Sequence, residues 1–216
     1  MIDDIKINAH SSIKFSAGAV LYFDPFHISE KSSDADIIFV THDHYDHFSP
    51  EDIEKIVKDD TVFVAPRSTA DLIRQNFAIP DDRIFSCAPG DSFEVKGIAV
   101  EAVAAYNPNK PQFHPKKNNW VGYVVTIGGC RYYICGDMDI TAEGSAVSCD
   151  VVLVPCGGTY TMNVEEAAEL VGRLSPKIAI PTHYGDIVGD ISCGRAFEAA
   201  CSKTAPDTKV VLKIAQ

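Results

Sequence analysis

Short apolar runs separated by polar or turn-forming residues recur along the chain, and most have the length of β-strands. Residues 37–40 read Ile-Ile-Phe-Val, a continuous apolar run that is typical of a strand buried on both faces. Gly128 and Gly129 separate two strand-like runs, 120–127 and 130–135, which predicts a hairpin with a two-residue turn of the primed type. The other runs predicted as strands are 5–8, 12–15, 20–23, 61–65, 83–86, 92–95, 98–104, 151–155, 177–181 and 209–214.

Helices are predicted between these strands from their start signals. Ser49 precedes Pro50 and two acidic residues, which indicates a helix running to about residue 58. Ser68 and Asn163 are predicted N-caps of helices that end at 76 and 174, and a further helix is predicted over 192–203. Because strands dominate and helices stand singly between them, the pattern predicts an α+β protein. Its two sheets are expected to pack face to face, with the helices outside.

Composition narrows the class of protein. The 216 residues contain no linker and no internal repeat, which favours a single domain over 1–216. A formal net charge of −11 disfavours partners with a phosphate backbone or an anionic membrane surface. The seven cysteines lack Cys-x-x-Cys spacing and are interpreted as reduced thiols, so a cytoplasmic location is expected. The N-terminus lacks a signal-peptide core, and the apolar runs are shorter than a membrane span.

The chemistry concentrates in the run His42-Asp43-His44-Tyr45-Asp46-His47, directly after the buried strand at 37–40. Alternate residues of an extended segment point the same way, so His42 and His44 can chelate one cation. The predicted N-cap at Ser49 requires a turn, so Asp46 and His47 can offer a second pair to a second cation. Imidazole and carboxylate at this density suit zinc, iron or manganese. A solvated polar loop is the competing interpretation, and the density of ligand types disfavours it.

Two later residues extend this set. Asp137 follows the strand predicted to end at 135, and a carboxylate with two oxygens can bridge two cations. His183 follows the strand at 177–181. Taken alone, Asp137 would be interpreted as a turn residue and His183 as a structural histidine. Beside the histidine run, both become candidate ligands.

These motifs together resemble the metallo-β-lactamase-fold hydrolases, and more narrowly their lactonase and phosphodiesterase-like branch, which includes ascorbate-6-phosphate lactonase-like proteins. The resemblance covers almost the whole chain. It is carried, in order, by His10-Ser11-Ser12, Asp24-Pro25, the run 42–47, Gly136-Asp137, the segment 155–162 and Thr182-His183-Tyr184.

The resemblance implies a four-layer αββα sandwich of two mixed sheets and a site for one or two metal ions, usually Zn2+, with Mn2+ or Fe2+ as alternatives. By analogy the first ion takes His42, His44 and the bridging Asp137, and the second takes Asp46, His47, Asp137 and His183. The nucleophile implied is a metal-bound water or hydroxide, with Asp46 orienting it and His183 completing the catalytic site. The substrate implied is a small ester, lactone or phosphodiester.

The chain departs from the family pattern at one place. The family usually supplies a third histidine to the first ion from a strand end in the middle of the chain, where this sequence has Ala104-Ala105-Tyr106-Asn107. Either Asn107 gives a weak oxygen ligand, or His114 folds back from the irregular segment 106–119. His114 can instead line a substrate entrance with Lys110, Lys116 and Lys117, which would favour an anionic substrate.

The remaining candidates support the site rather than form it. Asp24 is expected either to orient a ligand histidine through a hydrogen bond or, equally, to be a turn residue before Pro25. Asp139 is a further candidate to support a ligand in the same way. His10 and His27 are each interpreted either as a substrate contact near the metals or, equally, as a structural histidine, and His10 is also a possible extra ligand. Two further functions stay open at this stage. A non-catalytic or redox metal-binding protein of the same fold is suggested by the missing histidine, and a nuclease is disfavoured by length and charge.

Overall fold

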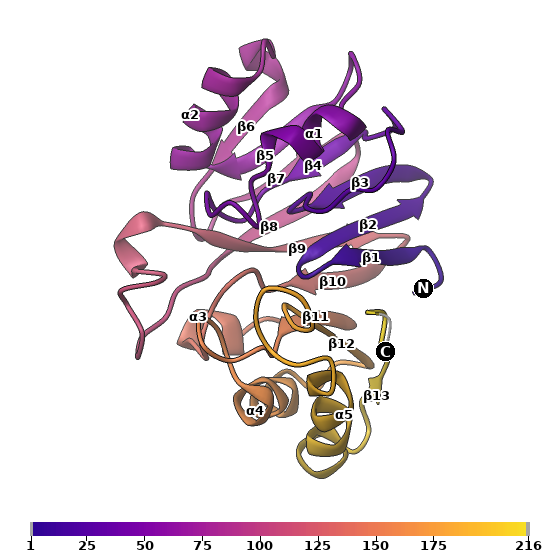
Figure 1. The fold of residues 1–216 in the computed structure, drawn as a ribbon, viewed down its shortest axis with the longest axis vertical. Helices are drawn as coiled ribbons and strands as arrows, with labels where there is room; N and C mark the ends of the chain where they lie inside the picture. Colours follow the sequence, from indigo (N-terminus) through magenta and orange to yellow (C-terminus); the bar gives the residue numbers. More distant parts are fainter. Residues whose placement is uncertain (1, 215–216) are drawn as a thin grey trace. The chain divides into compact units, whose positions relative to one another are not determined.

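The protein is described here from a computed structural model over residues 2–214, and its chain divides into two compact units. The first unit extends to Ala88 and the second begins at Pro89. Each unit contains one mixed β-sheet with helices (Figure 1). The expectation of a single domain stays a prediction. Within the described residues, no helix has the length and apolarity needed to cross a membrane.

The sheet of the first unit has six strands in the order β1-β2-β3-β4-β5-β6. Its first three strands pair antiparallel, and β3 to β6 pair parallel. The strands are β1 (Ile5–Ala9), β2 (Ser12–Ala17), β3 (Ala19–Phe23), β4 (Ile37–Phe39), β5 (Val62–Pro66) and β6 (Ile84–Cys87). The helices are α1 (Pro50–Ile56), α2 (Arg67–Asn76) and the 3-10 turn η1 (Asp81–Arg83). All three residues of β4 are fully buried, as the continuous apolar run predicted.

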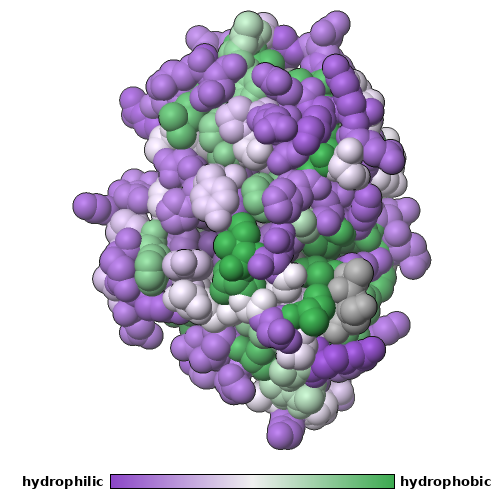
Figure 2. Space-filling view, viewed as in Figure 1, coloured by the Kyte–Doolittle hydropathy of each residue, from purple (hydrophilic) through white to green (hydrophobic). Residues whose placement is uncertain are grey.

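Both helices of this unit pack their apolar sides into one core. Ile53 and Ile73 lie there against Ile38 and Phe63 of the sheet. The opposite side of α2 is exposed and polar, and the surface over α1 and α2 is largely hydrophilic in Figure 2. Ser49 caps α1 as predicted by accepting the Asp52 N–H. The predicted cap of α2 at Ser68 is wrong, because β5 ends at Pro66 and the helix starts at the next residue.

The sheet of the second unit has seven strands in the order β13-β12-β11-β10-β9-β8-β7. Pairing is antiparallel from β7 to β10 and parallel from β10 to β13. The strands are β7 (Ser92–Val95), β8 (Ile98–Ala104), β9 (Val121–Ile127), β10 (Cys130–Ile134), β11 (Val151–Pro155), β12 (Ile178–Thr182) and β13 (Lys209–Val210). The helices are α3 (Ala142–Ser145), α4 (Val164–Leu174), α5 (Cys193–Thr204) and the 3-10 turn η2 (Lys116–Asn118).

Local signals account for most of the second unit. Gly128 and Gly129 both have positive φ, 58° and 76°, which confirms the primed turn between β9 and β10. Asn163 caps α4 in a full capping box with Glu166. The sequence pattern missed α3, because four residues are too few to show a helical period. The closing strand is shorter than predicted and ends at Val210.

The seven cysteines are free, as expected, and five of them are buried. Burial raises the pKa of the Cys149 and Cys201 thiols to about 12. Such thiols stay protonated near neutral pH, so they are poor metal ligands.

Candidate metal centre

In the first unit, the strand directions bring several candidate residues to one edge of the sheet. β1 and β3 are each antiparallel to β2, and β4 is parallel to β3, so all three strands run the same way. His10 follows β1, Asp24 follows β3 and the run 42–47 follows β4 shortly after its end. The backbone N–H of Asp24 donates to the Phe39 carbonyl at 2.9 Å, which joins the last two of these strand ends. Sites are commonly built at such an edge.

Asp24 is a buried acceptor for the residues around it. One carboxylate oxygen accepts the Thr41 backbone N–H at 2.7 Å, and the other accepts the Thr41 hydroxyl at 2.7 Å. That second oxygen also lies 2.7 Å from Nδ1 of His47. An ionised carboxylate only accepts hydrogen bonds, so the His47 proton is on Nδ1 and the lone pair on Nε2.

Thr41 links Asp24 to His42 and so constrains the tautomer of the His42 ring. Its hydroxyl proton is donated to Asp24, so its oxygen accepts from Nδ1 of His42 at 2.9 Å. His42 is therefore protonated on Nδ1 and carries its lone pair on Nε2. One buried carboxylate thus sets the ring nitrogen that both histidines can offer to a cation.

The ligand atoms within this unit lie at the separations that a bound ion requires. Nitrogen ligands at 2.0–2.1 Å from a tetrahedral zinc ion are about 3.3 Å apart. Nε2 of His42 lies 3.1 Å from Nδ1 of His44. Oδ2 of Asp46 lies 3.5 Å from Nε2 of His47. The run 42–47 therefore presents two neighbouring pairs of ligand atoms, as its spacing predicts.

His10 and His27 occupy different environments. His10 is buried, with Nε2 3.4 Å from Oδ2 of Asp46, so it lies beside the second ligand pair. The side chain of His27 is exposed and stacks on Phe26, with ring centroids 3.8 Å apart. His10 and Asp24 both have left-handed backbones, with φ of 52° and 47°. Such strain costs about 1–3 kcal/mol per residue and is concentrated at functional sites.

In the second unit, the strand directions again bring the candidates to one edge. β8 and β10 are each antiparallel to β9, and β11 and β12 continue parallel to β10. Asn107 lies beyond the end of β8, Asp137 beyond the end of β10, and His183 directly follows β12. His183 also has a left-handed backbone, with a φ of 58°.

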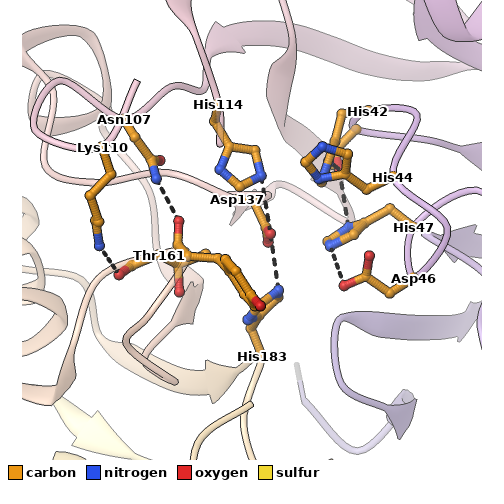
Figure 3. Close-up of polar contacts among 12 residues, drawn as sticks. His42, His44, Asp46, His47, Asn107, Lys110, His114, Asp137, Thr161 and His183 are labelled. Carbon is orange, nitrogen blue, oxygen red and sulfur yellow. Dashed lines mark hydrogen bonds and ion pairs between the residues drawn. The ribbon is translucent and has the colours of Figure 1, made fainter. Parts of the chain in front are cut away.

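Two imidazoles approach one oxygen of Asp137 (Figure 3). Nε2 of His183 lies 3.0 Å from Oδ2 of Asp137, and Nε2 of His114 lies 3.4 Å from the same oxygen. All three side chains are buried, and the His114 ring makes an edge contact with Trp120 at 5.6 Å between ring centroids. These donor atoms fit a divalent cation as those of the first unit do.

The structure separates the two candidates for the missing histidine. The Asn107 backbone N–H donates to the His114 carbonyl at 2.8 Å, which closes the loop between them. The side chain of Asn107 donates through Nδ2 to the Tyr160 carbonyl at 2.5 Å. Its Oδ1 is buried and has no hydrogen-bond partner among the described residues. His114, and not Asn107, places its side chain against Asp137.

The lysines of the segment 106–119 do not act alike. Lys110 points toward the segment that contains Thr161 (Figure 3). Its ammonium lies 2.9 Å from Oδ1 of Asp139. Burial raises the pKa of the Asp139 carboxyl, and the neighbouring Lys110 ammonium opposes that effect. Lys116 pairs with Glu143 at 2.7 Å, whereas Lys117 is simply exposed. Lys110 therefore pairs with a buried carboxylate, whereas Lys116 pairs with a partly exposed one.

Lys116 lines a cavity of about 550 Å³ in the second unit. Its lining includes Tyr106, the Lys116–Glu143 pair and the Arg131–Glu101 pair. None of the candidate ligands lines it. The charges within it are paired with one another, so it lacks a free group to select a ligand.

The backbone of His183 packs against Gly157, where only a residue without a side chain fits, and a substitution can test this contact. A Cβ on Gly157 would overlap the His183 carbonyl oxygen, and a neighbouring bond joins the Cys156 N–H to the Thr182 carbonyl at 3.1 Å. We expect Gly157→Ala to displace His183, weaken metal binding and lower the free energy of unfolding by about 1–3 kcal/mol. Metal content and urea unfolding measure the two effects.

Gly172→Ala is the matched control. Its Cβ would lie 2.9 Å from the Thr204 carbonyl oxygen, in the contact between α4 and α5. The two variants share a clash between a methyl group and a backbone carbonyl, but only one concerns a candidate ligand. Equal metal content in both variants would contradict the role given to Gly157.

The sequence did not predict the role of Thr41, nor the contacts that Lys110 and Asn107 make with the segment 158–162. Thr41 stands between the buried strand and the histidine run, and a hydroxyl in that position was the available signal. The contacts of Lys110 and Asn107 with the segment 158–162 had no signal, because they join residues more than fifty positions apart.

Comparison with known proteins gives consistent similarities. The model of a family described as the β-lactamase superfamily domain matches residues 4–183. A UPF0173 metal-dependent hydrolase of Carboxydothermus hydrogenoformans is 30% identical, with 90% of this chain and 93% of that protein covered. One from Thermoplasma volcanium is 29% identical, with 84% of each chain covered.

Among solved structures, a provisionally assigned metal-dependent hydrolase from Parabacteroides distasonis superposes with a TM-score of 0.82 at 28% identity. The superposition covers 98% of this chain and 93% of that one. These similarities confirm the α+β fold of the metallo-β-lactamase type, with two mixed sheets and helices, that was expected from the sequence.

Proposed function

Because this chain belongs to the β-lactamase superfamily and is a UPF0173 metal-dependent hydrolase, we propose that it cleaves a small ester, lactone or phosphodiester. The observation that carries the proposal is the set of contacts made by Asp24. Through Thr41 and His47 it fixes Nε2 as the nitrogen that two histidines offer to a cation. A histidine run that was only a polar loop would not need a buried carboxylate to set its tautomers.

We assign the ligands as two sets that share Asp137. By analogy with the family, His42, His44 and His114 would take the first ion, and Asp46, His47 and His183 would take the second. His114 replaces the histidine that the family usually has after β8, because it lies beside Asp137 and Asn107 does not. Zinc suits three imidazoles and a carboxylate, and manganese or iron are the alternatives for the same ligands.

When bound, the ions supply an activated water and polarise the scissile bond. The chain's own residues have separate tasks. Asp46 orients the attacking water, and His10, beside Asp46, contacts the substrate. Asp24 and Asp139 hold their neighbours in place and do not touch the reacting atoms.

We further propose a small anionic substrate and a cytoplasmic setting. The net charge of −11 disfavours a nucleic-acid substrate, because an acidic surface repels a phosphate backbone. A single small anion can still be bound, since the cations of the centre offset the surface field locally.

The test is metal content together with hydrolysis. Tag-free protein equilibrated with zinc or manganese is expected to hold about two ions per chain, as a bridged pair requires. It is expected to hydrolyse at least one member of a panel of activated esters, lactones and phosphodiesters. Chelation should abolish the activity and added metal should restore it. Protein that holds no metal after equilibration would contradict the proposal.

A further inference from the structure

We propose that Lys110 is a positioning residue that holds the loop 107–114 so that His114 stays beside Asp137. The inference rests on the proposed function, in which His114 is a metal ligand. It concerns how that ligand is kept in place, for which the strand order provides no answer, because His114 lies ten residues beyond the end of β8.

The loop is closed on itself but not anchored by its own hydrogen bonds. The Asn107 N–H donates to the His114 carbonyl at 2.8 Å, and the Phe113 N–H donates to the Lys110 carbonyl at 3.0 Å. These two bonds fix the shape of the loop. They leave its position to contacts with another part of the unit.

Lys110 makes the charged part of those contacts. Its ammonium donates to the Thr161 carbonyl at 2.5 Å and lies 2.9 Å from Oδ1 of Asp139. The Asp139 side chain is only 4% exposed, and the Lys110 ammonium is its ion-pair partner. A buried carboxylate is costly unless a cation lies next to it, so the pair strongly favours one position of Lys110.

Two neighbours of Lys110 fasten the same loop to the same segment. Asn107 donates through Nδ2 to the Tyr160 carbonyl, and the Phe113 ring makes an edge contact with the Tyr160 ring at 4.9 Å. Figure 3 shows Asn107 and Lys110 reaching side by side toward the segment that contains Thr161. The loop 107–114 is thus attached at three points to residues 160 and 161.

The segment that receives these contacts is hydrogen-bonded within itself and to the residue that follows Asp137. The Thr161 N–H donates to the Gly158 carbonyl at 2.7 Å, and the Met162 N–H donates to the Met138 carbonyl at 3.3 Å. Met138 and Asp139 are the two residues that follow Asp137. Lys110 therefore fixes the loop relative to the short stretch that holds the carboxylate, which is what the position of His114 requires.

A substrate contact is the alternative role for a lysine in this loop. Here the ammonium is already bound to a carbonyl and a buried carboxylate, whereas Lys117, which lies beyond the loop in η2, is exposed. A positioning role predicts an effect on metal binding without substrate. A substrate-binding role predicts an effect on KM alone.

The experiment compares metal affinity in four proteins by competition with a chelator, without substrate. Lys110→Met is expected to bind one of its two ions about 10- to 100-fold more weakly, the range found when an outer partner of a ligand is lost. Lys110→Arg, which keeps the charge and the donors, should recover most of the affinity. Lys117→Met, the same change at an exposed neighbour, should match the wild type. With cobalt, the d–d absorption of Lys110→Met should shift toward that of His114→Ala.

Lys110→Met leaves Asp139 without its cation and could fail to fold. The double variant Lys110→Met with Asp139→Asn removes that charge while still losing the bond to Thr161, and the same loss of affinity is expected. Wild-type affinity for both ions in folded Lys110→Met or in the folded double variant would overturn the inference, even if hydrolysis fell. Absence of metal from the wild-type protein would instead overturn the proposed function.

Discussion

Asp137→Asn should lower kcat/KM by more than about 100-fold and reduce the number of metal ions bound per chain. Losing an outer partner of a metal ligand costs about 10- to 100-fold, so losing the shared ligand itself should cost more. An amide has one oxygen in place of two and no negative charge. It would also turn an N–H2 group toward His114 or His183, whose Nε2 atoms lie 3.4 Å and 3.0 Å from the present carboxylate oxygen.

Elemental analysis and kcat/KM measure the two consequences of that change. Asp150→Asn is the control, because Asp150 is a partly exposed carboxylate of the same unit that pairs with Lys177 at 2.8 Å. That control should keep its metal and its rate. Two tightly bound ions in Asp137→Asn would show that the carboxylate is not a shared ligand.

Asp24→Asn should weaken metal binding by about 10- to 100-fold although Asp24 touches no metal in the proposed assignment. The amide oxygen can still accept the Thr41 N–H, but the amide nitrogen would face the proton on Nδ1 of His47. Two donors cannot share that contact, so His47 must move or shift its proton to Nε2. Either change removes its lone pair from the cation.

The same substitution should lower the free energy of unfolding of the metal-free protein by about 1–3 kcal/mol, the cost of a buried donor left unsatisfied. Urea unfolding of the metal-free protein and chelator competition separate the two effects. Asp34→Asn is the control, since Asp34 accepts from Tyr22 and Lys14 on the same sheet but is only partly buried. If Asp24→Asn bound metal as the wild type does, the tautomer argument would fail.

Several elements of the fold were predictable because their signals are local. The primed turn needs positive φ at two successive residues, and Gly128-Gly129 adopts it without a steric penalty. Asn163 and Glu166 form their capping box within one helical turn. Where the local signal was ambiguous, tertiary context decided: Pro66 ends β5, and α2 begins one residue before the serine that was expected to cap it.

The candidate ligands also divide into those that local sequence predicts and those that depend on tertiary contacts. The run 42–47 was predictable because its residues are adjacent and follow a buried strand. The contact of Asp24 with His47 joins residues 23 positions apart, and the strand directions bring them together. A single sequence records the residue types on both sides of such a contact, but not the contact.

By itself, then, the sequence determined the fold type and the order of the motifs, since strand periodicity, caps and the histidine spacing are properties of neighbouring residues. Only the tertiary structure placed the side chain of His114, and not that of Asn107, beside Asp137, because that placement depends on how the loop 107–114 closes and where Lys110 attaches it. Those contacts join residues far apart along the chain. Their energies depend on burial and geometry that no local pattern encodes.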